Sequence, residues 1–151
     1  MGEGDVPVFA VRVVVIFICL ILLPFLTLFE VPGDSMEELL GEVLSHIGKA
    51  KSANDPEELK TEAWMARANL ELFLIKLVLL HGLEEVPSPP PPRVKRNDPE
   101  RDLKLLNLAE EKVREAKRAF GEENYLLTYD NVWEAKNALT KIVTSTTKIP
   151  E

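Results

Sequence analysis

The side chains that could carry chemistry in this 151-residue chain are two histidines, paired glutamates and two tyrosines. His46 and His81 could transfer protons or bind a metal, but neither is followed in its own predicted helix by a second ligand one turn later. Five adjacent glutamate pairs fall at predicted helix starts or on polar faces, where the helix dipole and solvent account for them: Glu37/Glu38, Glu57/Glu58, Glu84/Glu85, Glu110/Glu111 and Glu122/Glu123. We therefore expect no catalytic residue, no metal site and no bound cofactor.

One catalytic arrangement stays open as an alternative. Glutamates, His46 and Tyr125 or Tyr129 could meet inside a helical bundle and form a small ligand-binding or hydrolytic site. The sequence has no Gly-rich phosphate loop, no Gly-x-Ser-x-Gly nucleophile motif and no Cys/His pair, since Cys19 is the single cysteine and lies in an apolar run. A binding role without catalysis is the first interpretation.

Charge excludes one class of partner. The chain has 18 Lys and Arg against 25 Asp and Glu, a formal charge of -7 and a pI near 5.0. A surface that follows nucleic-acid phosphates would oppose this field, so we expect no nucleic-acid partner. The absence of glutamine, together with many Glu and Lys residues, is typical of proteins from thermophiles.

The strongest single signal is the apolar run of residues 8–29, in which only Arg12 is charged. As a helix its 22 residues would extend about 33 Å, enough to cross a bilayer core. Arg12 lies one turn from the edge, where its side chain can reach the headgroups. After a short tail, residues 1–7, the sequence thus predicts a transmembrane anchor whose partner is the lipid bilayer.

We expect this anchor to stay uncleaved and to cross the cell membrane once. The run is longer than the apolar part of a usual signal peptide, and residues 27–32 offer no small-x-small cleavage site. Arg12 is on the N-terminal side, whereas the other flank carries Glu30 and Asp34 and no base before Lys49. The positive-inside rule then favours a cytoplasmic N-terminus and an extracellular helical domain.

The remaining chain predicts an all-α fold, a four-helix bundle made of two helical hairpins. Residues 34–82 form hairpin 1 and residues 98–146 form hairpin 2. Ser35 is interpreted as the cap of the first helix, and Asp55-Pro56 and Asp98-Pro99 each place a capping carboxylate before a proline at the first helical position. Gly82 and Gly121 are the predicted ends of the second and third helices.

Each helix has an apolar seam at three-four spacing, which predicts the core. The four seams are Met36, Leu40, Val43, Ile47 and Ala50; Leu59, Ala63, Ala66, Leu70, Phe73, Leu77 and Leu80; Leu106, Ala109, Val113, Ala116 and Phe120; and Tyr125, Thr128, Val132, Ala135, Leu139 and Ile142.

The two hairpins are separated by residues 83–97, a linker with five prolines that favours an extended polyproline II conformation. It can reach about 45 Å, while the second helix, with about 26 residues, is about 39 Å long. The third helix can therefore begin at either end of the bundle. The basic residues Arg93, Lys95 and Arg96 follow the prolines, so the linker is either a spacer or a docking segment.

The second helix has more apolar surface than one seam needs. Trp64, Leu72, Ile75 and Leu79 fall outside its seam, and Trp133 lies beside the seam of the fourth helix. These five residues are the predicted partner-binding surface. The sequence thus favours a membrane-anchored protein-protein interaction module, an accessory or scaffolding subunit of a membrane complex, whose partner is another protein or a second copy of the chain.

Overall fold

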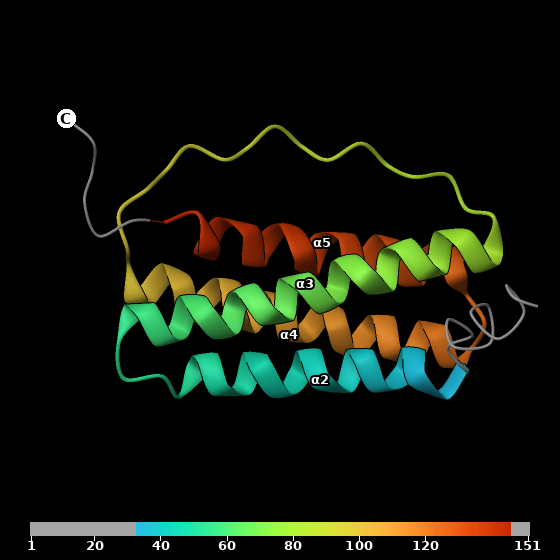
Figure 1. The fold of residues 1–151 in the computed structure, drawn as a ribbon, viewed down its shortest axis with the longest axis horizontal. Coiled ribbons are helices and arrows are strands. Elements are labelled where there is room, and N and C mark those ends of the chain that lie inside the picture. The colour runs from blue at the N-terminus through green and yellow to red at the C-terminus, as the bar shows by residue number, and fades with distance from the viewer. Residues whose placement is uncertain (1–32, 146–151) are drawn as a thin grey trace, which may run out of the picture. The chain divides into compact units, whose positions relative to one another are not determined.

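The computed structural model describes residues 33–145, which form four helices and no β-strand (Figure 1). They are α2 (Gly33–Lys51), α3 (Pro56–His81), α4 (Pro99–Gly121) and α5 (Tyr125–Val143). The all-α prediction is confirmed for this part of the chain. The predicted tail and anchor, residues 1–7 and 8–29, lie outside the described residues, and none of the four helices has the length and apolar character of a membrane span.

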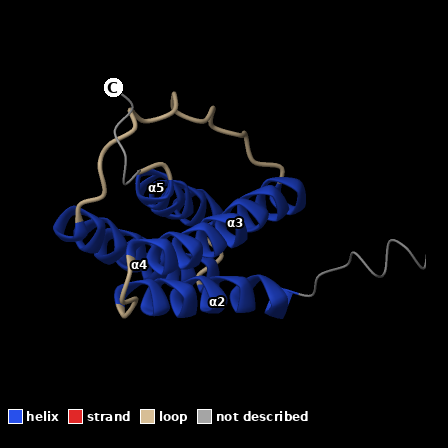
Figure 2. Ribbon diagram, turned by 60° about the vertical axis from the view of Figure 1, so that its left-hand side comes forward, coloured by secondary structure: helices blue, strands red, loops and turns tan. Residues whose placement is uncertain are grey.

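The helices form two antiparallel hairpins, α2 with α3 and α4 with α5, and the linker decides how the hairpins combine. It runs along the whole bundle, so α4 begins at the end opposite to the end of α3, and the two helices run in the same direction (Figure 1). We call the end where α2 begins the proximal end and the other the distal end. The linker and α2 lie on opposite sides of the bundle (Figure 2).

The helix limits of α3 and α4 follow from local chemistry. Asp55 precedes α3, and its Oδ1 accepts a hydrogen bond of 2.8 Å from the backbone N–H of Glu58. Asp98 does the same before α4, where it accepts from two backbone N–H groups. Gly82 adopts a left-handed conformation with φ of 61° directly after α3, a conformation that glycine adopts without steric cost. These three predictions are confirmed.

Two predicted limits are wrong by a few residues. Helix α2 begins at Gly33, so Ser35 lies within its first turn and does not precede it. Helix α4 includes Gly121, and the left-handed residue of the following turn is Glu123, with φ of 59°. The backbone N–H of Asn124 reaches the carbonyl of Ala119 at 2.9 Å, which closes the helix end around Glu123 in place of a glycine.

The four seams meet in one apolar core. All five predicted residues of α2 are buried, as are most of the other seams (Ala63, Ala66, Leu70, Phe73, Leu77, Leu106, Ala109, Val113, Ala116, Thr128, Val132, Ala135, Leu139 and Ile142). Leu59, Phe120 and Tyr125 pack against this core while partly exposed. Leu80 is 61% exposed, contrary to prediction, because a seven-residue repeat drifts by about 20° per heptad around a straight helix and leaves the core face.

Small residues decide which helices come closest. Helix α5 approaches both α3 and α4 closely, while α2 stays further from its neighbours. Ala135 and Ala138 of α5 face the core, as do Ala109 and Ala116 of α4, and alanine lets two backbones approach. The core face of α2 carries larger side chains, including Met36 and Ile47, which hold its backbone away.

Ion pairs connect the helices around the core. Lys51 at the end of α2 contacts Glu110 of α4, which also pairs with Arg114 at 2.8 Å. These two cations lower the pKa of Glu110 from its ordinary value of 4.5, the hydrogen bond from Lys51 being the largest cause. Between α4 and α5, the hydrogen bond between Lys112 and Glu134, at 3.2 Å, raises the pKa of Lys112.

Replacing Glu110 by glutamine is expected to lower the free energy of unfolding at pH 7 by about 0.5–1 kcal/mol, the usual size for a partly exposed pair. Because the folded state lowers the pKa of Glu110, the charged form contributes stability above its unfolded pKa, and this contribution disappears as the pH falls through the folded pKa. Urea unfolding from pH 7 to pH 3 should show the variant and the wild type converging. The Glu122→Gln variant, in an exposed i,i+4 pair with Arg118, is the control. A pH-independent difference would contradict the assignment.

Candidate interaction surfaces

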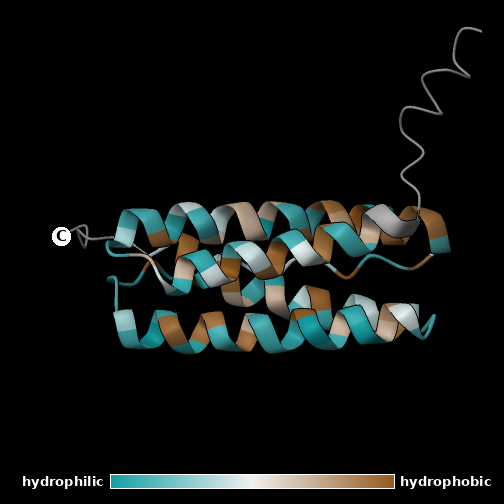
Figure 3. Ribbon diagram, turned by 90° about the horizontal axis from the view of Figure 1, so that it is seen from below, coloured by the Kyte–Doolittle hydropathy of each residue, from teal (hydrophilic) through white to brown (hydrophobic). Residues whose placement is uncertain are grey.

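An uncovered apolar surface follows the side of α3 that faces away from the core. Trp64, Leu72, Ile75 and Leu79 are exposed there by 55%, 42%, 51% and 77%, and Met65 lies beside them. We call these five residues the outer face of α3. Their spacing puts them on one stripe, opposite the buried Ala66, Leu70, Phe73 and Leu77. The proximal half of α3 is mostly hydrophobic in Figure 3.

Four of the five predicted partner-binding residues thus share one exposed face. Trp133 does not join them, because it lies on α5, partly buried against the core. Its indole Nε1 is buried and has no hydrogen-bond acceptor among the described residues. Trp133 thus packs against the core while partly exposed, and Trp64 is the more exposed of the two tryptophans.

A second apolar surface covers the proximal end of the bundle. Leu79 and Leu80 close α3 at this end, and Leu126 and Leu127 begin α5 beside them; all four are exposed. We call these four leucines the proximal patch. Monomeric soluble proteins rarely group large apolar side chains on their surface without a function. Helix α3 ends and α5 begins at this end of the bundle (Figure 1).

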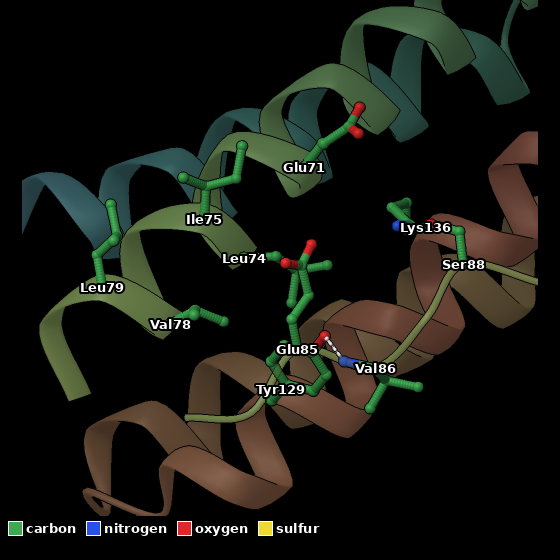
Figure 4. Close-up of a pocket in the computed structure, with 10 residues that line it drawn as sticks. All are labelled: Glu71, Leu74, Ile75, Val78, Leu79, Glu85, Val86, Ser88, Tyr129 and Lys136. Atoms are coloured by element: carbon green, nitrogen blue, oxygen red, sulfur yellow. Dashed lines mark hydrogen bonds between the residues drawn. The ribbon is translucent and has the colours of Figure 1, made fainter. Parts of the chain in front are cut away.

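The linker, α3 and α5 enclose a cavity of about 200 Å³ (Figure 4). Leu74, Val78 and other apolar side chains of α3 line one side of it. The hydroxyl of Tyr129 on α5 accepts a hydrogen bond of 2.9 Å from the backbone N–H of Val86, which fixes the first part of the linker to the helix. Sequence reasoning missed this contact, because nothing in the linker sequence indicates which helix it crosses.

A larger cavity of about 350 Å³ continues the first one under the prolines of the linker. Its charged lining residues are Arg67 and Glu71 of α3 and Lys136 and Lys141 of α5. Arg67 also donates from Nε to Thr140 Oγ1 at 2.9 Å, which ties α3 to α5 below the linker. The linker therefore bridges the groove between these helices and does not fill it.

The residues of the catalytic alternative do not come together. His46 Nδ1 lies 2.6 Å from Glu62 Oε2, in a contact between α2 and α3. Tyr125 stacks on His81 with ring centroids 3.5 Å apart, whereas Tyr129 faces the linker. The two cavities under the linker include Tyr129 but neither His46 nor Tyr125. Within residues 33–145, no group of three His, Cys, Asp or Glu side chains has the arrangement of a metal site.

Comparison with known protein families, with curated proteins and with solved structures gives no match to this chain.

Replacing Tyr129 by phenylalanine is expected to release the first part of the linker. The variant keeps the ring but removes the acceptor of the Val86 N–H, a loss of about 1 kcal/mol for a typical hydrogen bond. Hydrogen exchange followed by NMR should show faster exchange at Val86, with unchanged exchange in the middle of α5. The Tyr125→Phe variant is the matched control, because its hydroxyl makes no hydrogen bond to the described residues. Equal exchange at Val86 in both variants would contradict the contact.

Proposed function

We propose that this chain is a single-pass membrane protein whose helical domain holds a partner protein, as an accessory or scaffolding subunit of a membrane complex. The observation that carries the proposal is the outer face of α3. Residues 8–29 supply the anchor, the N-terminus lies in the cytoplasm, and the helical domain lies outside the cell.

The shape of the outer face favours a helical partner. Trp64, Leu72, Ile75 and Leu79 follow one another at steps that are sums of three and four residues, the spacing by which two helices pack side by side. Trp64 supplies the large aromatic anchor that binding surfaces often have. The flanking Glu71 and Lys76 give the stripe a polar edge on each side. An amphipathic helix of the partner fits these features.

The proximal patch supports the anchor. Residue 33 starts α2 at this end, and only residues 30–32 separate it from the predicted span. Extended chain covers at most about 3.6 Å per residue, so with this anchor residue 33 would lie within about 15 Å of the bilayer core. Exposed leucines such as Leu79, Leu80, Leu126 and Leu127 are favourable in the interfacial region of a membrane.

The anchor predicts how the full chain behaves in cells. Expressed with a C-terminal tag, the protein is expected to remain in the membrane pellet after an alkaline carbonate wash. The tag should be digested when protease is added to intact spheroplasts, while a cytoplasmic marker survives. Deletion of residues 2–29 should move the protein to the supernatant. Recovery of the full chain in the supernatant would contradict the anchor, and a protected tag would contradict the orientation.

The outer face predicts where the partner can be cross-linked. A photoreactive amino acid in place of Ile75 or Leu72 should give a cross-linked product in native membranes. The same replacement at Leu103 or Leu108 of α4 should give none, although these residues are 47% and 41% exposed, because they lie singly on different sides of their helix. An added Trp64→Asp change should abolish the product at Ile75, since it puts a charge into the apolar stripe.

The mass of the cross-linked product distinguishes the two kinds of partner. A product heavier than two copies of this chain, or one that contains another protein, supports the accessory-subunit role. A product of two copies would instead make the domain a self-associating module. Products of equal yield from α3 and α4 would contradict a defined surface on α3.

A further inference from the structure

A third cavity lies at the distal end, where the second half of the linker passes α4 and α5. It has a volume of about 340 Å³ and is lined by Pro92, Arg93, Lys95, Arg101 and Lys141. Its four charged residues are all cations, and they come from three elements: the linker, the start of α4 and the end of α5. We call this cavity the basic cleft. The sequence shows Arg93 and Lys95 as neighbours, but only the fold adds Arg101 and Lys141.

The cations of the cleft have few anionic partners. Among the described residues, Arg93, Lys95 and Lys141 make no ion pair. Arg101 contacts the carboxylate of Asp102 at 3.2 Å through one Nη, while its Nε is buried and has no acceptor. Asp102 itself is almost fully buried. The cleft thus concentrates positive charge that the described residues neutralise only in part.

The other carboxylates at the start of α4 are already engaged. Asp98 accepts hydrogen bonds from the backbone N–H groups of Glu100 and Arg101. Glu100 pairs with Lys104 at 3.2 Å on the exposed side of the helix. The chain has a formal charge of -7, so a cluster of cations such as the basic cleft is a local departure from its overall charge. The cations repel one another, and a bound anion would relieve this repulsion.

The cleft is also held in place. Next to its basic residues, Asn97 Oδ1 accepts a hydrogen bond of 2.7 Å from the hydroxyl of Ser145, which joins the end of the linker to the end of α5. Pro92 restricts the backbone directly before Arg93. Cations on a backbone that is fixed before a ligand arrives lose less entropy on binding than cations on a free tail.

We propose that the basic cleft binds a small soluble anion that carries two or more phosphate groups. Arg93 and Arg101 supply planar guanidinium groups suited to phosphate oxygens, and Lys95 and Lys141 add point charges around them. The cavity has room for a diphosphate group and part of the molecule attached to it. The cleft lies one length of α3, about 39 Å, from the proximal end.

The exposed leucines lie at the opposite end of the bundle from the cleft, so we take the ligand to be a soluble anion and not a headgroup of the anchoring membrane. That choice alone depends on the proposed function. The cation cluster itself does not depend on the anchor, so the two proposals can fail separately.

Calorimetry with pyrophosphate tests the cleft in the full chain, reconstituted in nanodiscs of zwitterionic lipid. The wild type should bind one pyrophosphate, more tightly than inorganic phosphate, and the affinity should fall as NaCl is raised from 50 to 200 mM. The double variant R93Q/K141Q should bind about tenfold more weakly or worse, because two charge-assisted contacts are lost. The control R114Q/R118Q removes the same charge from α4 outside the cleft and should leave the affinity within about twofold.

Other results would overturn the proposal. These are no binding at 1 mM pyrophosphate, or an equal loss of affinity in both double variants. Vesicles that contain phosphatidylinositol bisphosphate, offered to the same nanodiscs, distinguish the source of the phosphate: binding to these vesicles without binding to pyrophosphate would show a lipid site. Binding of a polyglutamate peptide as tightly as pyrophosphate would show an unspecific cationic surface. Unchanged circular dichroism of R93Q/K141Q ensures that its loss of affinity reports on the cleft.

Discussion

The crossing of the linker from the proximal to the distal end is the constraint on which the rest of the arrangement depends. Five prolines in residues 83–97 favour an extended chain, and the polypeptide that leaves α3 at the proximal end re-enters the bundle at the distal end (Figure 1). Helix α4 must then run parallel to α3, and α5 must run back between them. Helix α5 therefore lies close to both helices. This close approach is possible because the buried side chains of α5 include alanine and threonine, which are small. A short flexible loop would allow the hairpins to pack in another orientation.

This connectivity also explains why α3 keeps an uncovered side. Helix α2 contacts α3 through pairs such as His46–Glu62, and α5 contacts it through Arg67–Thr140, while the linker passes above the groove between α3 and α5. The linker reaches only part of the stripe, since Ile75 and Leu79 line the cavity beside it. Trp64, Leu72, Ile75 and Leu79 thus remain between 42% and 77% exposed among the described residues, and this exposure is what the proposed partner would cover.

Sequence periodicity was enough to predict the core, because burial in a helical bundle depends on which side of each helix a residue occupies. The residue types at the helix ends were enough to predict Asp55 and Asp98 as N-terminal caps and Gly82 as a C-terminal cap, because capping depends on neighbouring residues. Periodicity failed at Leu80, because a seven-residue repeat drifts around a straight helix and leaves the core face. Trp133 lies on another helix than the other predicted partner-binding residues, partly buried against the core. The direction of α4 could not be predicted, because the linker is long enough for either end. The meeting of Lys141 with Arg93 follows from the second hairpin alone, since α5 ends beside the start of α4 and Arg93 shortly precedes that start.

The two ends of the bundle differ in a way that the overall composition hides. Exposed leucines gather at the proximal end, and cations gather at the distal end in a chain with a net negative charge. The distance between these two surfaces depends on the crossing of the linker. Helix α5 begins with Leu126 and Leu127 near the end of α3 and ends with Lys141 near the start of α4. Reversing the second hairpin would move Lys141 to the end of the bundle that carries Leu79 and Leu80, together with Arg93 and Arg101. The parallel placement of α3 and α4 is thus what keeps a charged surface away from an apolar one, so that each can meet a different environment.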